Sequence, residues 1–134
     1  MPNAATWLAI TLLQAGAAGD SAWRRDGDVA VPMRDGVLLR AEVLRPSREG
    51  RFPVLVYRTP YGKNDAITEY TTFRHAVERG YAVVVQDVRG RYASDGTFEA
   101  YRQEGHDGYD TIEWAAAQPW SDGRVGTFGL SYPG

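Results

Sequence analysis

The sequence predicts an α/β fold: a mostly parallel sheet that begins with an antiparallel hairpin. Residues 52–58 and 81–87 are near-continuous apolar runs, which is typical of strands buried on both faces. A segment of helical length separates them, and such a β-α-β crossover joins parallel strands. Ahead of this unit, two strand-like runs flank Asp35–Gly36, and an Asp-Gly pair in that setting is typical of a hairpin turn.

The elements can be placed in order along the chain. The first arm of the hairpin covers residues 29–33. The second arm, 37–46, partly alternates apolar with polar residues, which indicates an antiparallel strand with one face in water. The remaining elements are a strand, a helix, a strand, a helix and a last strand, expected over residues 52–58, 66–80, 81–87, 104–118 and 124–130. This β-β-β-α-β-α-β order predicts an open α/β sheet.

The beginning of the chain is expected to lie outside this domain. We interpret residues 1–27 as a leader and linker, with 20–28 polar, and residues 28–134 as the domain. Residues 4–19 are apolar with small residues near their end, as before a signal-peptide cleavage site, but no positively charged segment precedes them. The run is also short for a membrane span. The sequence thus favours a cytoplasmic location slightly over export, leaves the location open, and predicts no membrane span.

The composition is that of a globular protein that does not bind nucleic acid. Of the 134 residues, 43% are hydrophobic and 24% are charged, which are ordinary values for a globular domain. The net charge is -2, so phosphate-backbone binding has little electrostatic support. The absence of cysteine excludes thiolate nucleophiles and disulfides. Any chemistry must therefore come from oxygen and nitrogen, and nothing in the sequence implies a metal or cofactor.

The end of the chain holds the clearest candidate for chemistry. An apolar run ends in Gly129-Leu130-Ser131, and a strand that runs into Gly-x-Ser can present the serine hydroxyl at a sharp strand-to-helix turn. Ligands of open α/β sheets bind at the carboxyl ends of the parallel strands. We therefore expect loops 59–63 and 88–96 and the Ser131 turn to meet at one edge, with Tyr61 and Ser131 facing the same cleft.

The same residues leave a second function class open. Gly129 and Gly134 have the spacing of the glycines in a Walker A phosphate loop, whose Lys-Ser/Thr pair would come after residue 134. Tyr132 and Pro133 count against this, because they add bulk and remove a donor where phosphate needs closely approaching amides. A truncated nucleotide-binding domain is therefore the alternative to a nucleophile turn.

Four stretches together resemble a known family. They are Val-Pro-Met-Arg-Asp-Gly-Val (31–37), Arg-Thr-Pro-Tyr-Gly-Lys (58–63), Gln-Asp-Val-Arg-Gly (86–90) with Ser-Asp-Gly (94–96), and Trp-Ser-Asp-Gly (120–123) with Gly-Leu-Ser-Tyr-Pro-Gly (129–134). In order and spacing they resemble the N-terminal portion of the cocaine esterase and X-Pro dipeptidyl-peptidase (S15-like) family of α/β-hydrolases. The resemblance spans about residues 28–134, and it implies an α/β-hydrolase sheet that this chain follows as far as the nucleophile turn.

The resemblance also implies roles for three residues. Ser131 matches the nucleophile that forms an acyl-enzyme from an ester, an amide or an X-Pro peptide. The Tyr61 hydroxyl and the Tyr132 backbone N–H match the two donors of the oxyanion hole. Small esters, amides or short peptides are the implied substrates, with no metal or cofactor; the choice among them and the oligomeric state stay open.

In this family the catalytic Asp and His follow the serine in chain order, where this sequence has no residues. We therefore expect the chain as given to be inactive by itself, and a non-functional truncated product is a further alternative. Other polar and aromatic residues are expected to be structural. Asp87 is expected to anchor a loop or pair with Arg89, and the remaining four are solvated or capping histidines and core aromatics: His75, His106, Trp114 and Trp120.

Overall fold

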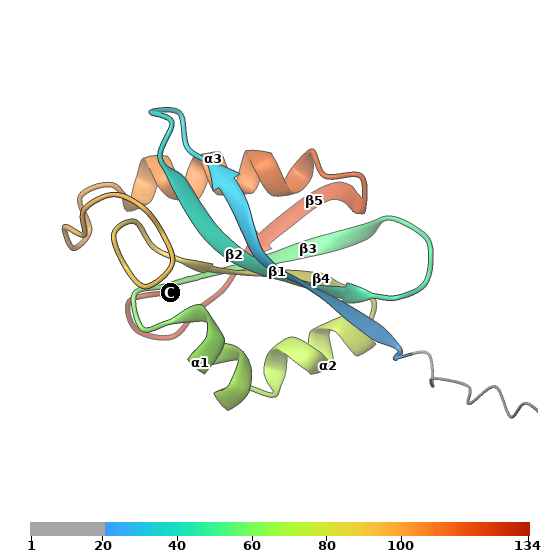
Figure 1. The fold of residues 1–134 in the computed structure, drawn as a ribbon. Helices are drawn as coiled ribbons and strands as arrows, with labels where there is room; N and C mark the ends of the chain where they lie inside the picture. The colour runs from blue at the N-terminus through green and yellow to red at the C-terminus, as the bar shows by residue number, and fades with distance from the viewer. Residues whose placement is uncertain (1–20) are drawn as a thin grey trace, which may run out of the picture.

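A computed structural model describes residues 21–134 as one five-stranded mixed sheet with helices on both faces (Figure 1). Its elements are β1 (Trp23–Pro32), β2 (Leu38–Pro46), β3 (Phe52–Thr59), α1 (Lys63–Glu69), α2 (Thr72–Glu78), β4 (Ala82–Asp87), α3 (Glu104–Ala116) and β5 (Ser121–Thr127). The expected leader, up to position 20, lies outside the described residues. In the described part of the chain, no helix has the length and apolar character needed to cross a bilayer.

The sheet has the predicted mixture of antiparallel and parallel strands. Its order is β1-β2-β4-β3-β5; β2 pairs antiparallel with β1 and β4, whereas β3 pairs parallel with β4 and β5. The hairpin turns where predicted, and the Met33 N–H donates to the Val37 carbonyl oxygen at 2.9 Å. Helix α3 covers one face, and α1 and α2 cover the other (Figure 1). The expectation of an α/β fold with an antiparallel opening is confirmed.

Two apolar layers hold the helices to the sheet. On the central strand β4, Val84 belongs to the layer beneath α3, while Val83 and Val85 belong to the layer beneath α1 and α2. This division follows from the alternation of side chains along a strand. Phe73 and Val77 of α2 are buried against the second layer. Every residue of β4 is buried, which explains its run without polar alternation.

The polar segment before residue 29 is strand, which corrects the linker prediction for residues 23–28. Strand β1 begins at Trp23, opposite Pro46, and its register shifts between Asp26 and Val29. Arg45 of β2 pairs with the Asp26 carboxylate at 3.1 Å. An edge strand is exposed along one side, so a polar segment can form one. Such a segment lacks the apolar run from which a buried strand is predicted.

Two boundaries and the burial of one strand also differ from the sequence prediction. The helix expected over 66–80 is two helices, because Tyr70 is extended and its ring packs edge-on against Phe73 at 6.1 Å between centroids. The last strand covers 121–127, earlier than expected, and the chain leaves the ladder after the Phe128 N–H donates to Val56 O at 3.2 Å. Strand β2 does not have a wetted face, since the polar residue Glu42 is buried within it.

Candidate active site

Loops from neighbouring parallel strands meet at the carboxyl edge of the sheet, as expected. The Val88 N–H, just after β4, donates to Thr59 O at the end of β3 at 3.0 Å. The Arg91 Nε donates to Pro60 O at 3.0 Å, so the two loops are joined twice. The C-terminus lies beside these loops (Figure 1). Tyr61 and Ser131 therefore follow adjacent strands, β3 and β5, and are both exposed at this edge.

Ser131 has the backbone of a strained turn. Its φ angle is 64°, in the left-handed region where a residue with a Cβ costs about 1–2 kcal/mol. The Gly134 N–H donates to Ser131 O at 3.1 Å and closes the turn. Gly129 is needed here, because a Cβ at that position would collide with the Pro133 backbone. The result is an exposed serine on a tight turn after a strand, which is the geometry of a nucleophile elbow.

Tyr61 is held by its backbone while its ring stays in solvent. Its N–H donates to Thr59 Oγ1 at 3.0 Å, and its side chain is 56% exposed. The next residue, Gly62, has a φ of 102°, and a Cβ there would lie 3.1 Å from the Tyr92 ring. The loop is therefore fixed around a phenol that is free to donate to a ligand.

A buried cation lies directly after this loop. Lys63 is 2% exposed, and its Nζ lies 2.8 Å from an Asp28 carboxylate oxygen, 3.2 Å from Glu42 and 3.8 Å from Asp87. Asp87 also accepts the Lys63 N–H at 2.7 Å and the Ala93 N–H at 3.2 Å. Asp87 thus anchors the loops that follow β3 and β4.

Burial and pairing set the protonation of this cluster. Burial raises the pKa of Asp87, and two amide hydrogen bonds and the charge of Lys63 offset it only in part. Burial alone would lower the pKa of Lys63, but its bonds to Asp28 and Glu42 raise it. Glu42 is likewise buried, yet Arg25, the Asp28 amide and Lys63 hold its pKa below the usual range.

Of the two roles predicted for Asp87, a loop anchor or a partner of Arg89, the structure shows the loop anchor. Arg89 turns to the other face of the sheet edge and binds Asp107 and Asp35, each at 2.8 Å. Burial of this arginine is offset by those two carboxylates, and the Asp107 bond contributes most to raising its pKa. Arg89 thereby ties the hairpin turn to helix α3.

The residue after the serine is also held by its side chain. The Tyr132 hydroxyl donates to Glu104 Oε1 at 3.1 Å and accepts the Tyr101 N–H at 3.0 Å. Burial raises the pKa of the Tyr132 phenol, and the nearby Glu104 charge adds to this, so the phenol keeps its proton. Glu104 in turn pairs with Arg58.

The residues expected to be structural are placed as such. His75 and His106 are exposed on α2 and α3. Trp114 and Trp120 pack edge to face at 6.3 Å between ring centroids and lie against the core layer beneath α3.

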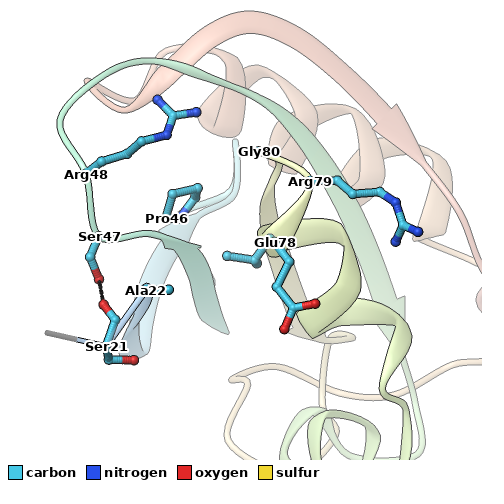
Figure 2. Close-up of a pocket in the computed structure, with 9 residues that line it drawn as sticks. Ser21, Ala22, Pro46, Ser47, Arg48, Glu78, Arg79 and Gly80 are labelled. Carbon is cyan, nitrogen blue, oxygen red and sulfur yellow. Dashed lines mark hydrogen bonds between the residues drawn. The ribbon is translucent and has the colours of Figure 1, made fainter. Parts of the chain in front are cut away.

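A wide pocket of about 710 Å³ lies at the opposite end of the parallel strands (Figure 2). Residues after β2 and before β4 line it, among them Arg48 and Arg79, and the Ser47 hydroxyl donates to Ser21 O at 2.6 Å. Ligands of such sheets bind at the carboxyl ends of the strands, so this pocket is not the candidate active site.

The sequence profile of the X-Pro dipeptidyl-peptidase (S15) family matches residues 35–134. The chain belongs to this family. It is 46% identical over 110 residues to the cocaine esterase of Rhodococcus sp. (strain MB1 Bresler), a match that covers 80% of this chain and 19% of that protein. The chain spans about a fifth of the length of the curated relatives that it matches.

Solved structures agree with this assignment. A CocE/NonD family hydrolase from Staphylococcus aureus aligns with a TM-score of 0.73 and 32% identity, over 81% of this chain and 23% of that one. An α-amino acid ester hydrolase aligns with a TM-score of 0.76 and 27% identity, over 95% of this chain and 25% of that one. The α/β-hydrolase fold is thereby confirmed, and the chain belongs to a family of ester and peptide hydrolases.

The strain at Ser131 can be measured. We expect Ser131→Gly to be more stable than Ser131→Ala by about 1 kcal/mol, because glycine adopts a positive φ without the Cβ penalty. The measurement is urea unfolding of both variants of this chain. Ser121 lies in strand β5 and is the control: there the alanine variant should be the more stable one. Equal stability of the two Ser131 variants would contradict a strained elbow.

The charge cluster predicts a pH-dependent loss in Lys63→Met. Near pH 7 the variant removes the ammonium that pairs with the buried carboxylates of Glu42 and Asp87. We expect a loss of about 3 kcal/mol in unfolding free energy. The pKa of Lys63 is raised and that of Glu42 lowered, so their mutual stabilisation is present between about pH 5 and 10. The loss should therefore shrink near pH 4, where the carboxylates take up protons.

Urea unfolding at the two pH values measures this difference. Arg124→Met is the control, because the Arg124 side chain that pairs with Asp122 is 79% exposed and its loss should change little at either pH. A loss in Lys63→Met that is the same at both pH values would mean that packing of the side chain, and not its charge, is what matters.

Proposed function

We propose that this chain supplies the nucleophile and the oxyanion hole of a serine hydrolase that cleaves ester or amide bonds through an acyl-enzyme. The observation that carries the proposal is Ser131, an exposed serine with φ of 64° in the turn that follows the parallel strand β5, in a chain of the S15 family. A positive φ at a residue with a Cβ costs free energy, and residues with such strained backbones cluster at active sites.

The proposed reaction has two halves. The Ser131 Oγ attacks the carbonyl carbon and gives its proton to a base, and the leaving group departs with a proton to leave an acyl-serine. Water then attacks the acyl-serine and releases the acid. Both histidines of the sequence are exposed on helices, so we place the base and its orienting acid in the four fifths of the relatives' length that this chain does not span.

Two donors are proposed for the oxyanion: the Tyr61 hydroxyl and the Tyr132 backbone N–H. Negative charge develops on the carbonyl oxygen during attack, and fixed donors stabilise it, each typically by about 3 kcal/mol. The geometry supports both choices. Tyr61 is an exposed phenol on a loop fixed by Thr59, and Tyr132 follows the serine and is anchored through its own side chain.

Small esters, amides or short peptides are the proposed substrates, in keeping with the names of the relatives, which include a cocaine esterase and an α-amino acid ester hydrolase. Family membership over residues 35–134 supports this class over a phosphate loop. We further propose that the chain by itself is inactive, because it has the nucleophile without its base.

Ser131→Ala tests the nucleophile. The complete chain, joined in place of the matching fifth of the Rhodococcus cocaine esterase, gives a chimera whose labelling by a fluorophosphonate probe and ester hydrolysis can be measured. We expect Ser131→Ala to abolish labelling and to lower kcat by about 10⁴-fold or more, because the acyl-serine can no longer form. Ser94→Ala is a buried control and should stay labelled. Continued labelling of Ser131→Ala, or a folded chimera that is never labelled, contradicts the assignment.

Tyr61→Phe tests the first oxyanion donor in the same chimera. Loss of one donor should lower kcat by about 10²-fold while KM changes little, because the bond forms mainly in the transition state. The serine should still react with the probe, more slowly. Tyr92→Phe removes an exposed hydroxyl from the neighbouring loop and serves as the control. An unchanged kcat in Tyr61→Phe would remove Tyr61 from the oxyanion hole.

A further inference from the structure

Four contacts fix the side chain of Tyr132, and one of them is with the Phe98 ring, whose centroid lies 6.2 Å from that of Tyr132. Its hydroxyl donates to Glu104 Oε1 at 3.1 Å and accepts the Tyr101 N–H at 3.0 Å. Its ring stacks on the Tyr101 ring, with centroids 4.4 Å apart and planes 23° apart. Since each phenol carries one proton, the bond to Glu104 uses the only donor that Tyr132 has outside its backbone.

The partner of this hydroxyl is itself anchored to the centre of the sheet. Glu104 opens helix α3 and pairs through its second oxygen with Arg58 of β3. The Arg58 Nε donates to Gln86 Oε1 of β4 at 2.7 Å, and the Thr111 hydroxyl lies 3.0 Å from the same oxygen. A polar chain thus runs from the serine turn to the two central strands.

Apart from the ring contacts of Tyr132, few interactions hold the turn in the described part of the chain. Leu130 is 78% exposed and Ser131 is exposed, so apolar burial contributes little at the turn itself. Within residues 129–134 the backbone makes one hydrogen bond inside the turn, from Gly134 to Ser131 at 3.1 Å. The only hydrogen bonds that this segment makes to other described segments are the two at the Tyr132 hydroxyl.

We propose that Glu104 is a positioning residue for the reaction: through the Tyr132 hydroxyl it sets the direction of the Tyr132 N–H, the second oxyanion donor. This inference rests on the proposed function. An oxyanion donor acts only when it lies about 2.7–3.1 Å from the developing charge. The peptide between Ser131 and Tyr132 adjoins a strained residue, so it can relax if the side chain behind it is released. Arg58 supports the same geometry by holding Glu104.

The competing interpretation is that this chain of contacts only stabilises the fold. Two substitutions that keep shape separate the interpretations. Tyr132→Phe removes the hydroxyl and keeps the ring and the N–H, and Glu104→Gln removes the charge and keeps the volume. If the contacts only stabilise the fold, each variant lowers the fraction of folded enzyme, and the folded molecules bind the transition state as tightly as the parent does. A positioning role predicts folded molecules that bind the transition state less well.

The test measures transition-state binding in the chimera described above. An arylboronic acid adds to the serine oxygen and forms a tetrahedral adduct with an oxygen in the oxyanion hole. We expect each variant to raise the boronate Ki about tenfold and to lower kcat about tenfold, with KM within about twofold of the parent. The double variant should lose no more than Tyr132→Phe alone, because without the hydroxyl Glu104 has no bond through which to act on Tyr132.

Two matched controls and one internal check accompany the test. Glu99→Gln and Tyr109→Phe alter an exposed carboxylate that pairs with Arg102 and an exposed phenol on α3, and should leave Ki unchanged. Ki does not depend on the fraction of folded enzyme, so a variant that only unfolds more readily loses rate and keeps Ki. Reduced kcat with an unchanged Ki in Tyr132→Phe and Glu104→Gln therefore overturns the positioning role while the proposed function stands. If Ser131→Ala retains activity, both fall.

Discussion

The carboxylate of Asp87 fixes the relation between the two loops on which the site depends. It stands at the end of the central strand β4, is 1% exposed, and accepts one amide from each loop, Lys63 and Ala93. A buried carboxylate is costly unless it is hydrogen-bonded and paired, and here the adjacent Lys63 ammonium meets that need. Tyr61 precedes this lysine by two positions, so the loop that presents the phenol ends in a buried ion cluster.

The serine turn is held in a different way from the Tyr61 loop. The Tyr61 loop gains its rigidity from buried charges beneath it, whereas the turn after β5 is exposed and strained and makes its side-chain hydrogen bonds through Tyr132. The two halves of the candidate oxyanion hole therefore rest on separate polar networks that share the central strands β3 and β4 as a base.

Much of the fold could be predicted because the buried strands are near-continuous apolar runs in the sequence. The predicted strand 81–87 has no polar alternation, and in the structure every residue of β4 (Ala82–Asp87) is buried. Strand β1 could not be predicted in full, because its first half is polar and an edge strand needs no apolar run. Its pairing with β2 depends on contacts such as that of Asp26 with Arg45. The break at Tyr70 could not be foreseen either, because it depends on aromatic packing with Tyr57 and Phe73.

Some residues of the candidate site could likewise be predicted from the sequence, and others could not. Ser131 and Tyr61 belong to short motifs that the sequence displays, and the parallel sheet brings their loops to one edge. Lys63, Glu104 and Arg58 carried a weaker signal, since a charged residue in a sequence is normally solvated. Lys63 is a lone lysine in the predicted loop that follows a buried strand, and Glu104 stands at the first position of a helix; the sequence gives no further indication of their roles. Their partners come from distant segments and could only be seen in three dimensions.

The burial of Lys63 has a consequence for the chemistry of the folded surface. It is the single lysine of the sequence; the other basic side chains are arginines and two histidines. With 2% of its side chain exposed, its amine is closed to acylating reagents as long as the loop after β3 stays in place. After a brief pulse of an amine-reactive reagent, the extent of Lys63 modification, measured by mass spectrometry, therefore reports how often that loop opens.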